Sequence, residues 1–428
     1  MGKYTLLFQT LYILLKEGLK YLLFRNYTKL VKNIVHGLYD KNMLYVKIVQ
    51  SISSNENILN DELVEDLKDY TDKVPYSEAE VDRKLLEDIE QIQLLGNKKL
   101  IIDGLLPINS GMISLVFEGR IDDKHVVVKV LRKNIREKLN KAFKDLEYVV
   151  KKFSKFPKIR NFNIIDIFNE NKTIIMDQLE FKKEMEYIKM FQNKWKDIDY
   201  VKIPDVYEEY TNILNDVIVM EYIDGKNIHD ISEVNKEKYA YLLAKFNFKG
   251  IFFDSLYHSD LHQGNILFLN DTNNNSNNNA NLKLGIIDFG IVGVMGKEEQ
   301  NDYFMFFKHL VKDEYQKIVD NVVRNMVEPK TIYDDLETNN LNDMNKKLID
   351  EFTHIRTVSK NIGAHEMYRL NKILMEYGLQ LKKGFCKMEL AIAVVEGICN
   401  KLSTKEGYIT YMDRAYKEFL PKFMLDEF

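Results

Sequence analysis

The chain has little cysteine, no large excess of charge and no long hydrophobic run. Cys386 and Cys399 are the only cysteines among 428 residues, and both fall in a segment with a helical pattern. Two such residues exclude a disulfide framework and a thiolate metal site, and they favour an intracellular, reducing compartment. The formal net charge of −4 gives no electrostatic basis for a nucleic acid as the main partner.

No uncharged segment is long enough to cross a bilayer. At the N-terminus the longest uncharged run is 4–15, whereas a spanning helix needs about 20 apolar residues. Residues 1–25 are nevertheless apolar, with Gln9, Lys16 and Lys20 on one helical stripe. We expect an amphipathic helix that either packs on the protein or lies in a membrane interface. The start has no pattern of a signal peptide, a transit peptide or a myristoylation site.

Hydrophobic periodicity divides the rest of the chain into three parts. Residues 26–95 have apolar residues at helical spacing and are expected to form a helical extension. Residues 96–226 combine helices, expected at 136–155 and 178–195, with strands. Residues 227–428 are mostly helical. Strands are expected at 113–121, 125–131, 216–222, 265–270 and 282–290. The last two form a predicted hairpin, and we expect the asparagine-rich loop that joins them (270–281) to be solvated and disordered.

Three polar residues at this hairpin are of the types that phosphoryl transfer needs. Asp260 and Asn265 lie in "HSDLHQGN", and Asp288 follows an apolar strand in "IDFG". In a kinase one carboxylate accepts the proton of the acceptor hydroxyl, while a second carboxylate and a carboxamide oxygen hold Mg²⁺ against the phosphates of ATP. The order predicts Asp260 as catalytic residue and Asn265 and Asp288 as metal ligands. Asp-Phe-Gly alone is often only a turn.

His258 and His262 are expected to support the structure of the catalytic loop, because no further ligand completes a zinc site.

Lys129 stands within the apolar strand "VVVKVL". A lone lysine there would ordinarily lie at a sheet edge with its amine in water. Because this strand precedes the other motifs in the order of a kinase, we expect Lys129 to bind the α- and β-phosphates. Its acidic partner stays open among Glu147, Glu180 and Glu184, which lie on helical segments downstream.

From about residue 40 to residue 410 the sequence resembles the UbiB-type (aarF-domain-containing) atypical kinases. The Lys-x-Gly-Gln motif of that family is similar to "KIVQ" (47–50), its small-residue nucleotide loop to "NSGM" (109–112) and its Glu-x-Asp helix to "QLEFKKEMEY". Its "HADPHPGN" loop is similar to "HSDLHQGN", and "IDFG" matches unchanged. The resemblance implies an α+β, bilobal protein-kinase-like fold. It has an N-lobe with a small antiparallel sheet at 96–226, a mostly helical C-lobe at 227–428 and an N-terminal helical extension over the active site.

The resemblance also implies ATP and Mg²⁺ as cofactors. It favours Glu184 as the partner of Lys129. Glu147, which fits the spacing of ordinary kinases better, is the alternative, and Glu180 is expected near the metal or the nucleotide. The cofactor-binding positions that it implies are Ser110, Gly111, Lys129, Glu221, Lys47 and Gln50. Val49 stands where the family has glycine, and Gln178 where it has the first Glu of Glu-x-Asp. These departures leave the preference between ATP and ADP open.

The segment after Asp288 constrains the acceptor. Only "IVGVMG" separates "DFG" from the next helical segment, whereas a protein kinase has a longer activation segment there to seat a peptide. We therefore expect a lipid or small-molecule acceptor, or ATP hydrolysis, in an atypical kinase or ATPase near a membrane. The alternatives are a phosphotransferase of the aminoglycoside-kinase type and a nucleotide-binding pseudokinase scaffold. Peripheral contact with a membrane and a homodimer are both compatible with these interpretations.

Overall fold

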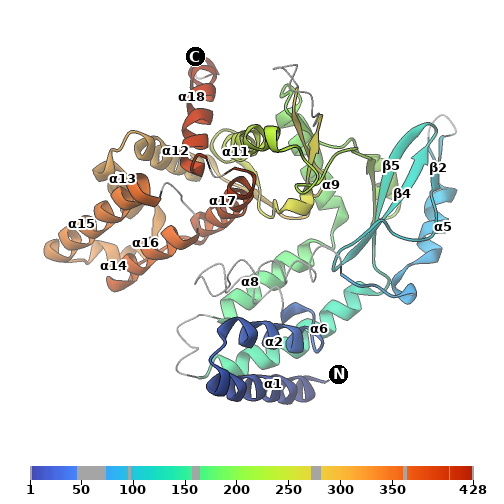
Figure 1. Ribbon diagram of the computed structural model, residues 1–428, viewed down its shortest axis with the longest axis horizontal. Coiled ribbons are helices and arrows are strands. Elements are labelled where there is room, and N and C mark those ends of the chain that lie inside the picture. Colours follow the sequence, from blue (N-terminus) through green and yellow to red (C-terminus); the bar gives the residue numbers. More distant parts are fainter. Residues whose placement is uncertain are drawn as a thin grey trace. The chain divides into compact units, whose positions relative to one another are not determined.

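The computed structural model describes residues 2–45, 74–94, 98–156, 164–270, 281–359, 364–403 and 405–426 (Figure 1). The chain divides into two compact units. Unit 1 comprises Met1–Glu186 and Asp205–Tyr222, and unit 2 comprises Tyr187–Pro204 and Ile223–Phe428. The predicted helix of Lys47 and Gln50 lies outside the described residues, as do residues 271–280 of the asparagine-rich loop.

Unit 1 is built on an antiparallel sheet of six strands. The order is β1-β2-β4-β5-β7, and β3 pairs with β4. The strands are β1 (Gln93–Leu94), β2 (Lys98–Ile102), β3 (Asn109–Ser110), β4 (Ser114–Ile121), β5 (Lys124–Leu131) and β7 (Val217–Glu221). The β4–β5 hairpin turns at Asp122, which has a φ of 53°. The three strands predicted within 113–222 are confirmed.

The two faces of this sheet bury different parts of the core. Val126, Val128 and Val130 of β5 are fully buried in one cluster with residues of helix α5 (Arg83–Gln91). Because side chains alternate along a strand, Lys129 lies on the opposite face, directly across from Ile218 of β7. That face belongs to a second cluster, which includes residues of α6. The alternation therefore places Lys129 on the helix-covered side of the sheet.

This second cluster receives residues from the unit 1 helices α1 (Lys3–Phe24), α2 (Tyr27–Tyr39), α6 (Ile135–Phe153) and α8 (Ile164–Asp177). Helix α10 (Glu208–Ile213) instead contributes Tyr210 to the first cluster. Helix α9 (Phe181–Trp195) begins in unit 1 and ends in unit 2. Helix α1 packs against α2 and α6 (Figure 1), with Thr10 in a 2.6 Å hydrogen bond to the Tyr45 hydroxyl. Among the described helices, none is long and apolar enough to cross a membrane.

The sheets of unit 2 are small and carry the polar motifs. Strand β10 (Lys283–Ile286) lies between β9 (Ile266–Leu269) and β6 (Val201–Lys202). Strands β9 and β10 pair antiparallel, with Ile286 opposite Ile266, so the predicted hairpin is confirmed. A separate pair joins β8 (Leu256–His258) to β11 (Val292–Val294).

Helices make up most of unit 2. Helix α11 (Lys236–Phe252) is buried on most of its surface and packs against α17, α18 and β10. The others are α12 (Lys297–Val311), α13 (Tyr315–Asn321), α14 (Lys330–Asp334), α15 (Thr338–His354), α16 (Ala364–Glu376), α17 (Lys383–Leu402) and α18 (Tyr408–Asp426). The predicted helical pattern after position 297 is confirmed, except that β12 (Val327–Glu328) and β13 (Gln380–Leu381) form a short antiparallel pair.

Candidate active site

The two polar motifs of unit 2 meet at the imidazole of His258, the last residue of β8. The backbone N–H of Asp260 donates to His258 Nδ1 over 3.2 Å. Because Nδ1 accepts, the ring proton lies on Nε2, which donates to the backbone carbonyl of Asp288. The pairing of Val292 with His258 joins the same segments through β8 and β11. The predicted scaffold role of His258 therefore has a geometric basis, since the ring joins the Asp260 loop to the Asp288 strand end.

Asn265 holds the same loop from its other end. Its Nδ2 donates to the carbonyl of Asp260 over 3.0 Å, and its own carbonyl accepts from the N–H of Ile287 over 3.2 Å. The side chain is 9% exposed. Since Nδ2 is committed to Asp260, the carboxamide oxygen is turned away from that carbonyl. The β9–β10 hairpin thereby brings the segment of Asn265 beside the strand that leads to Asp288, as the sequence predicts.

The donor set suits Mg²⁺. Asp288 is half-buried, and its Oδ1 accepts the N–H of Gly290 over 2.8 Å. A carboxylate and a carboxamide oxygen are hard ligands, and Mg²⁺ is commonly bound by one or two protein oxygens together with phosphates and water. Among the described residues, no group of three or more His, Cys, Asp or Glu side chains could hold a metal. A metal here would therefore depend on a phosphate ligand as well as on Asn265 and Asp288.

Aromatic packing fixes the position of the residue after Asp288. Phe289 is fully buried. Its ring centroid lies 4.9 Å from that of Phe191 and 5.7 Å from that of His258. Phe191 in turn stacks on Trp195 at 5.0 Å. The "DFG" turn is therefore anchored by an apolar side chain, while its carboxylate stays at the surface of this core.

Burial lowers the pKa of His258, because the charged imidazolium would lose its hydration; the nearby Asp288 and Asp260 act in the opposite direction. The folded state then binds fewer protons than the unfolded state below the ordinary histidine pKa of about 6.5. We expect His258→Gln to destabilise the fold at pH 7.5, and we expect the difference from wild type to shrink as the pH falls from 6.5 to 5. The change can reach about 1.4 kcal/mol per pH unit. Urea unfolding across this range measures it.

The matched control is His229→Gln, at an exposed position of unit 2. That variant should unfold in parallel with wild type at each pH. A constant difference between His258→Gln and wild type over the whole range would contradict the assignment of a neutral, buried imidazole.

In unit 1, Lys129 forms a buried ion pair with Glu184. Lys129 Nζ lies 2.6 Å from Glu184 Oε1, and the two side chains are 9% and 4% exposed. Phe181, one helical turn before Glu184 on α9, places its ring centroid 5.5 Å from the same Nζ. Glu147 instead pairs with Lys151 on the surface of α6. Of the candidate partners, the geometry favours Glu184; its part in catalysis stays a prediction.

Glu180 is held in a different cluster. Arg136 of α6 donates to Glu180 Oε1 over 2.9 Å and to Asp216 Oδ1 over 3.0 Å. The Glu180 side chain is 60% exposed. The expectation that Glu180 lies near the metal or the nucleotide stays a prediction.

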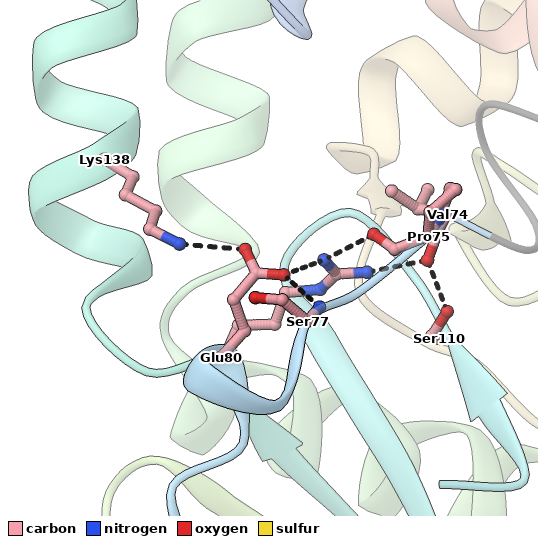
Figure 2. Close-up of polar contacts among 7 residues, drawn as sticks. Val74, Pro75, Ser77, Glu80, Ser110 and Lys138 are labelled. Atoms are coloured by element: carbon pink, nitrogen blue, oxygen red, sulfur yellow. Dashed lines mark hydrogen bonds and ion pairs between the residues drawn. The ribbon is translucent and has the colours of Figure 1, made fainter.

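The predicted nucleotide loop is tied to the segment that precedes α5 (Figure 2). Ser110 Oγ donates to the carbonyl of Val74 over 2.5 Å, and the N–H of Val74 donates to the carbonyl of Ser110 over 2.9 Å. Arg132, which is 4% exposed, donates to the same Val74 carbonyl over 2.9 Å, to Pro75 over 3.1 Å and to Glu80 over 3.2 Å. Ser110 is therefore held by Val74, and Arg132 in turn fixes the carbonyl of Val74.

Neighbouring Gly111 has room around it. An added Cβ would meet nothing closer than Ser114 Oγ, at 3.8 Å. Packing within the protein therefore does not require glycine at this position. A close approach by a ligand to the backbone is one reason for a glycine, and the nucleotide-binding role of Gly111 stays a prediction.

Glu221 ends β7 with its side chain turned to backbone. Its carboxylate accepts the N–H of Asp205 over 3.1 Å, and its own N–H donates to the carbonyl of Asp205 over 2.8 Å. The side chain thus holds the start of 205–222 against the strand end. This is a structural contact, and a contact of Glu221 with nucleotide stays a prediction.

Sequence reasoning missed Arg132 and its partner Glu80. Glu80 also accepts from Lys138 over 2.8 Å, so it bridges two basic side chains. Burial and the contacts with Lys138, Ser77 and Arg132 act in opposite directions on its pKa, and the net effect is a lowered value. The only available signal was a basic residue directly after the apolar strand β5, which is common and unspecific.

Residues 105–322 of the chain, half of its length, match the ABC1 atypical kinase-like domain. The chain belongs to the UbiB/ABC1 family of atypical kinases. The family and the predicted α+β, protein-kinase-like fold are therefore confirmed. The chain is 26% identical over 294 residues to protein ACTIVITY OF BC1 COMPLEX KINASE 8, chloroplastic, of Arabidopsis thaliana, an alignment that covers 66% of this chain and 36% of that protein.

Bacterial relatives support the same family assignment. The probable protein kinase UbiB of Pasteurella multocida is 26% identical over 320 residues, which cover 72% of this chain and 56% of that protein. The chain thus spans about half the length of the curated relatives it matches. Among solved structures, the Rv3197–erythromycin complex from Mycobacterium tuberculosis superimposes with a TM-score of 0.51 at 18% identity, over 82% of this chain and 87% of that one. At this identity the likeness shows the fold alone.

Proposed function

We propose that this protein transfers the γ-phosphoryl group of ATP, with Mg²⁺, to a lipid or small-molecule acceptor or to water. The observation that carries the proposal is the loop assembly in unit 2. One imidazole and one carboxamide hold the backbone of Asp260 and Asp288 in place. The family supports a phosphotransferase, since residues 105–322 match an atypical kinase-like domain.

Each residue has a distinct role in the proposed reaction. Asp260 accepts the proton of the acceptor hydroxyl while the oxygen of that hydroxyl bonds to the γ-phosphorus. The bond between the γ-phosphorus and the β–γ bridging oxygen breaks at the same time, which releases ADP. Asn265 and Asp288 hold Mg²⁺, which when bound neutralises charge on the phosphates. Lys129, oriented by Glu184, binds the α- and β-phosphates.

The remaining predicted positions bind the rest of the nucleotide. Ser110 and Gly111 lie in the proposed nucleotide loop, and Glu221 ends the strand that leads out of unit 1. Lys47 and Gln50, outside the described residues, are proposed to act from the N-terminal extension. The proposed roles of all these residues rest on the family resemblance.

The segment after Asp288 supports a small acceptor. Residues 292–294 form β11 and pair with β8, and α12 begins at Lys297. Gly293 lies against Tyr257, and a Cβ at this position would fall 2.1 Å from the ring. The pairing therefore needs a glycine, and only Met295 and Gly296 lie between β11 and α12, which leaves no long segment to seat a peptide. This favours a lipid or small-molecule acceptor over a protein.

Nucleotide with Mg²⁺ is expected to stabilise the fold. A ligand at a hundredfold excess over its Kd adds about 2.7 kcal/mol to the free energy of unfolding, enough to raise Tm by a few degrees. Asp288→Asn should remove most of the Mg²⁺-dependent part, because a metal-binding carboxylate becomes a neutral amide. Thermal melting with ATP, with and without Mg²⁺, measures both effects.

The matched control for this test is Asp230→Asn, at an exposed position of unit 2. It should retain the full Mg²⁺-dependent shift. An unchanged Tm of wild type at saturating ATP and Mg²⁺ would overturn the proposed function.

A further inference from the structure

A short segment of unit 1, residues 74–80, is bonded to the nucleotide loop at one end and to the β5–α6 junction at the other. At its first residue, the N–H of Val74 donates to the carbonyl of Ser110 over 2.9 Å, and Ser110 Oγ donates to the carbonyl of Val74 over 2.5 Å (Figure 2). At its last residue, the carbonyl of Glu80 accepts the N–H of Lys133 over 2.8 Å. We call residues 74–80 the anchor segment.

Arg132, the residue that follows β5, binds both ends of the anchor segment. Its Nη2 donates to the carbonyl of Val74 over 2.9 Å, and its Nη1 donates to the carboxylate of Glu80 over 3.2 Å. The backbone N–H of the arginine donates to the carbonyl of Ile113 over 2.9 Å, directly after the nucleotide loop (109–112). The arginine therefore contacts the end of the loop directly and its interior through Val74.

Stability alone does not require an arginine at this position. Arg132 is 4% exposed, and among the described residues its Nε has no hydrogen-bond partner. A buried guanidinium with one N–H unbonded is a costly way to stabilise a fold, and apolar residues of similar volume often serve as well or better. Arg132 also lies three residues after Lys129, the proposed phosphate-binding lysine. This place in the fold indicates a role in the site in addition to one in packing.

We propose that Arg132 is a positioning residue for the nucleotide. Its guanidinium keeps the anchor segment against the loop, so that the backbone of Ser110 and Gly111 is already ordered when the phosphates bind. A loop that is ordered in advance loses less conformational entropy on binding. Because the Ser110 hydroxyl donates to Val74, we assign it to this support and not to the ligand. The inference deepens the proposed function and rests on the nucleotide loop assigned there.

The kinetic test uses a conservative variant. Arg132→Lys keeps the charge but loses the planar fork that reaches three acceptors, the carbonyls of Val74 and Pro75 and the carboxylate of Glu80. We expect the KM for Mg²⁺–ATP to rise about tenfold, the effect of losing one hydrogen bond to a charged group. The kcat should hardly change, because saturating nucleotide orders the loop. Initial rates of ADP formation measure both quantities, and a lower kcat at unchanged KM would overturn the positioning role.

The matched control is Arg83→Lys. Arg83 pairs with Glu78 of the anchor segment over 2.6 Å, and its side chain is 41% exposed. No hydrogen bond of the described structure joins this pair to the nucleotide loop. Arg83→Lys should therefore match wild type in both KM and kcat. An equal rise of KM in the two lysine variants would contradict a specific role for Arg132.

A double-mutant cycle tests whether the Ser110 hydroxyl and Arg132 act through the same carbonyl. Ser110→Ala removes one hydrogen bond to Val74 and should also raise the KM for Mg²⁺–ATP. Because both side chains donate to that carbonyl, their effects should be coupled. Ser110→Ala/Arg132→Lys should then show about the KM of Arg132→Lys alone. Fold-changes that multiply would mean that the hydroxyl acts on the ligand by itself, and the proposed arrangement would be wrong.

Hydrogen exchange without nucleotide measures the order of the loop directly. The amides of Val74 and Gly111 donate to the carbonyls of Ser110 and Ser114, and both should exchange faster in Arg132→Lys than in wild type. Strand β5 should exchange as in wild type, because the core of the sheet is unchanged. Equal acceleration in β5 would indicate a general loss of stability, and unchanged exchange at both amides would show that the arginine does not order the loop. Either result overturns the inference.

The outcomes for wild type and variant separate this inference from the proposed function. Failure of the proposed function appears in wild type, as no shift in Tm with Mg²⁺–ATP. Failure of the inference alone appears as a normal shift in wild type and the same nucleotide affinity in Arg132→Lys. A normal shift in wild type, together with a raised KM and faster loop exchange in Arg132→Lys, supports both.

Discussion

Asp260→Asn is expected to lower ATP turnover by about two orders of magnitude or more, because a positioned general base contributes 10²- to 10⁴-fold to such reactions. Nucleotide affinity should hardly change, since this carboxylate acts on the acceptor and not on the phosphates. The loop should also survive the substitution. Its contacts with His258 and Asn265 use the N–H and the carbonyl of Asp260, and neither involves the side chain.

The turnover test needs two readouts on the same protein. ADP formation follows chemistry, and the Mg²⁺–ATP-dependent shift in Tm follows binding. Asp230→Asn, at an exposed position of the same unit, should match wild type in both. Full ADP formation by Asp260→Asn would refute its assignment as the catalytic base, and loss of the Tm shift in that variant would assign the carboxylate to nucleotide binding instead.

Strand patterns in the sequence predicted most of the sheet structure but not every helix. The hairpins β4–β5 and β9–β10 were predictable because alternation and turn residues are local signals. Helix α8 was not predicted. Its sequence, "IIDIFNENKTIIMD", is rich in isoleucine and asparagine, which have modest helix propensity. Phe168 and Ile175 are buried in the core cluster of unit 1, so packing supplies the stability that the local sequence lacks.

The site was predictable to the extent that its residues are close in sequence. Asp260, Asn265 and Asp288 flank one hairpin, so their order alone places them together in unit 2. The partner of Lys129 depends on how α9 packs on the sheet, and three glutamates had suitable helical positions. Arg132 has a further obstacle, because its partners lie 52 to 58 residues away and two of them are backbone carbonyls. Every residue has a backbone carbonyl, so the sequence does not indicate which carbonyl accepts a hydrogen bond from Arg132.

Breaking the Lys129–Glu184 pair is expected to lower the free energy of unfolding strongly, and replacing both residues is expected to restore most of it. Lys129→Met leaves the carboxylate of Glu184 buried without this cation, and breaking such a pair destabilises a protein by about 3–5 kcal/mol. Replacing both residues, in Lys129→Met/Glu184→Leu, removes the uncompensated charge and should restore most of that stability. Urea unfolding measures both. As a control, Lys151→Met breaks the exposed pair with Glu147 and should cost less than about 1 kcal/mol.

The same two variants separate a structural role of the pair from a role in the reaction. If Lys129 binds phosphates, the double variant recovers stability but stays without the Mg²⁺–ATP-dependent shift in Tm and without turnover, because no apolar side chain replaces an ammonium group beside a phosphate. If the pair only joins β5 to α9, nucleotide binding returns together with the fold. Recovery of turnover in the double variant would therefore refute the phosphate-binding role of Lys129, whatever the stability data show.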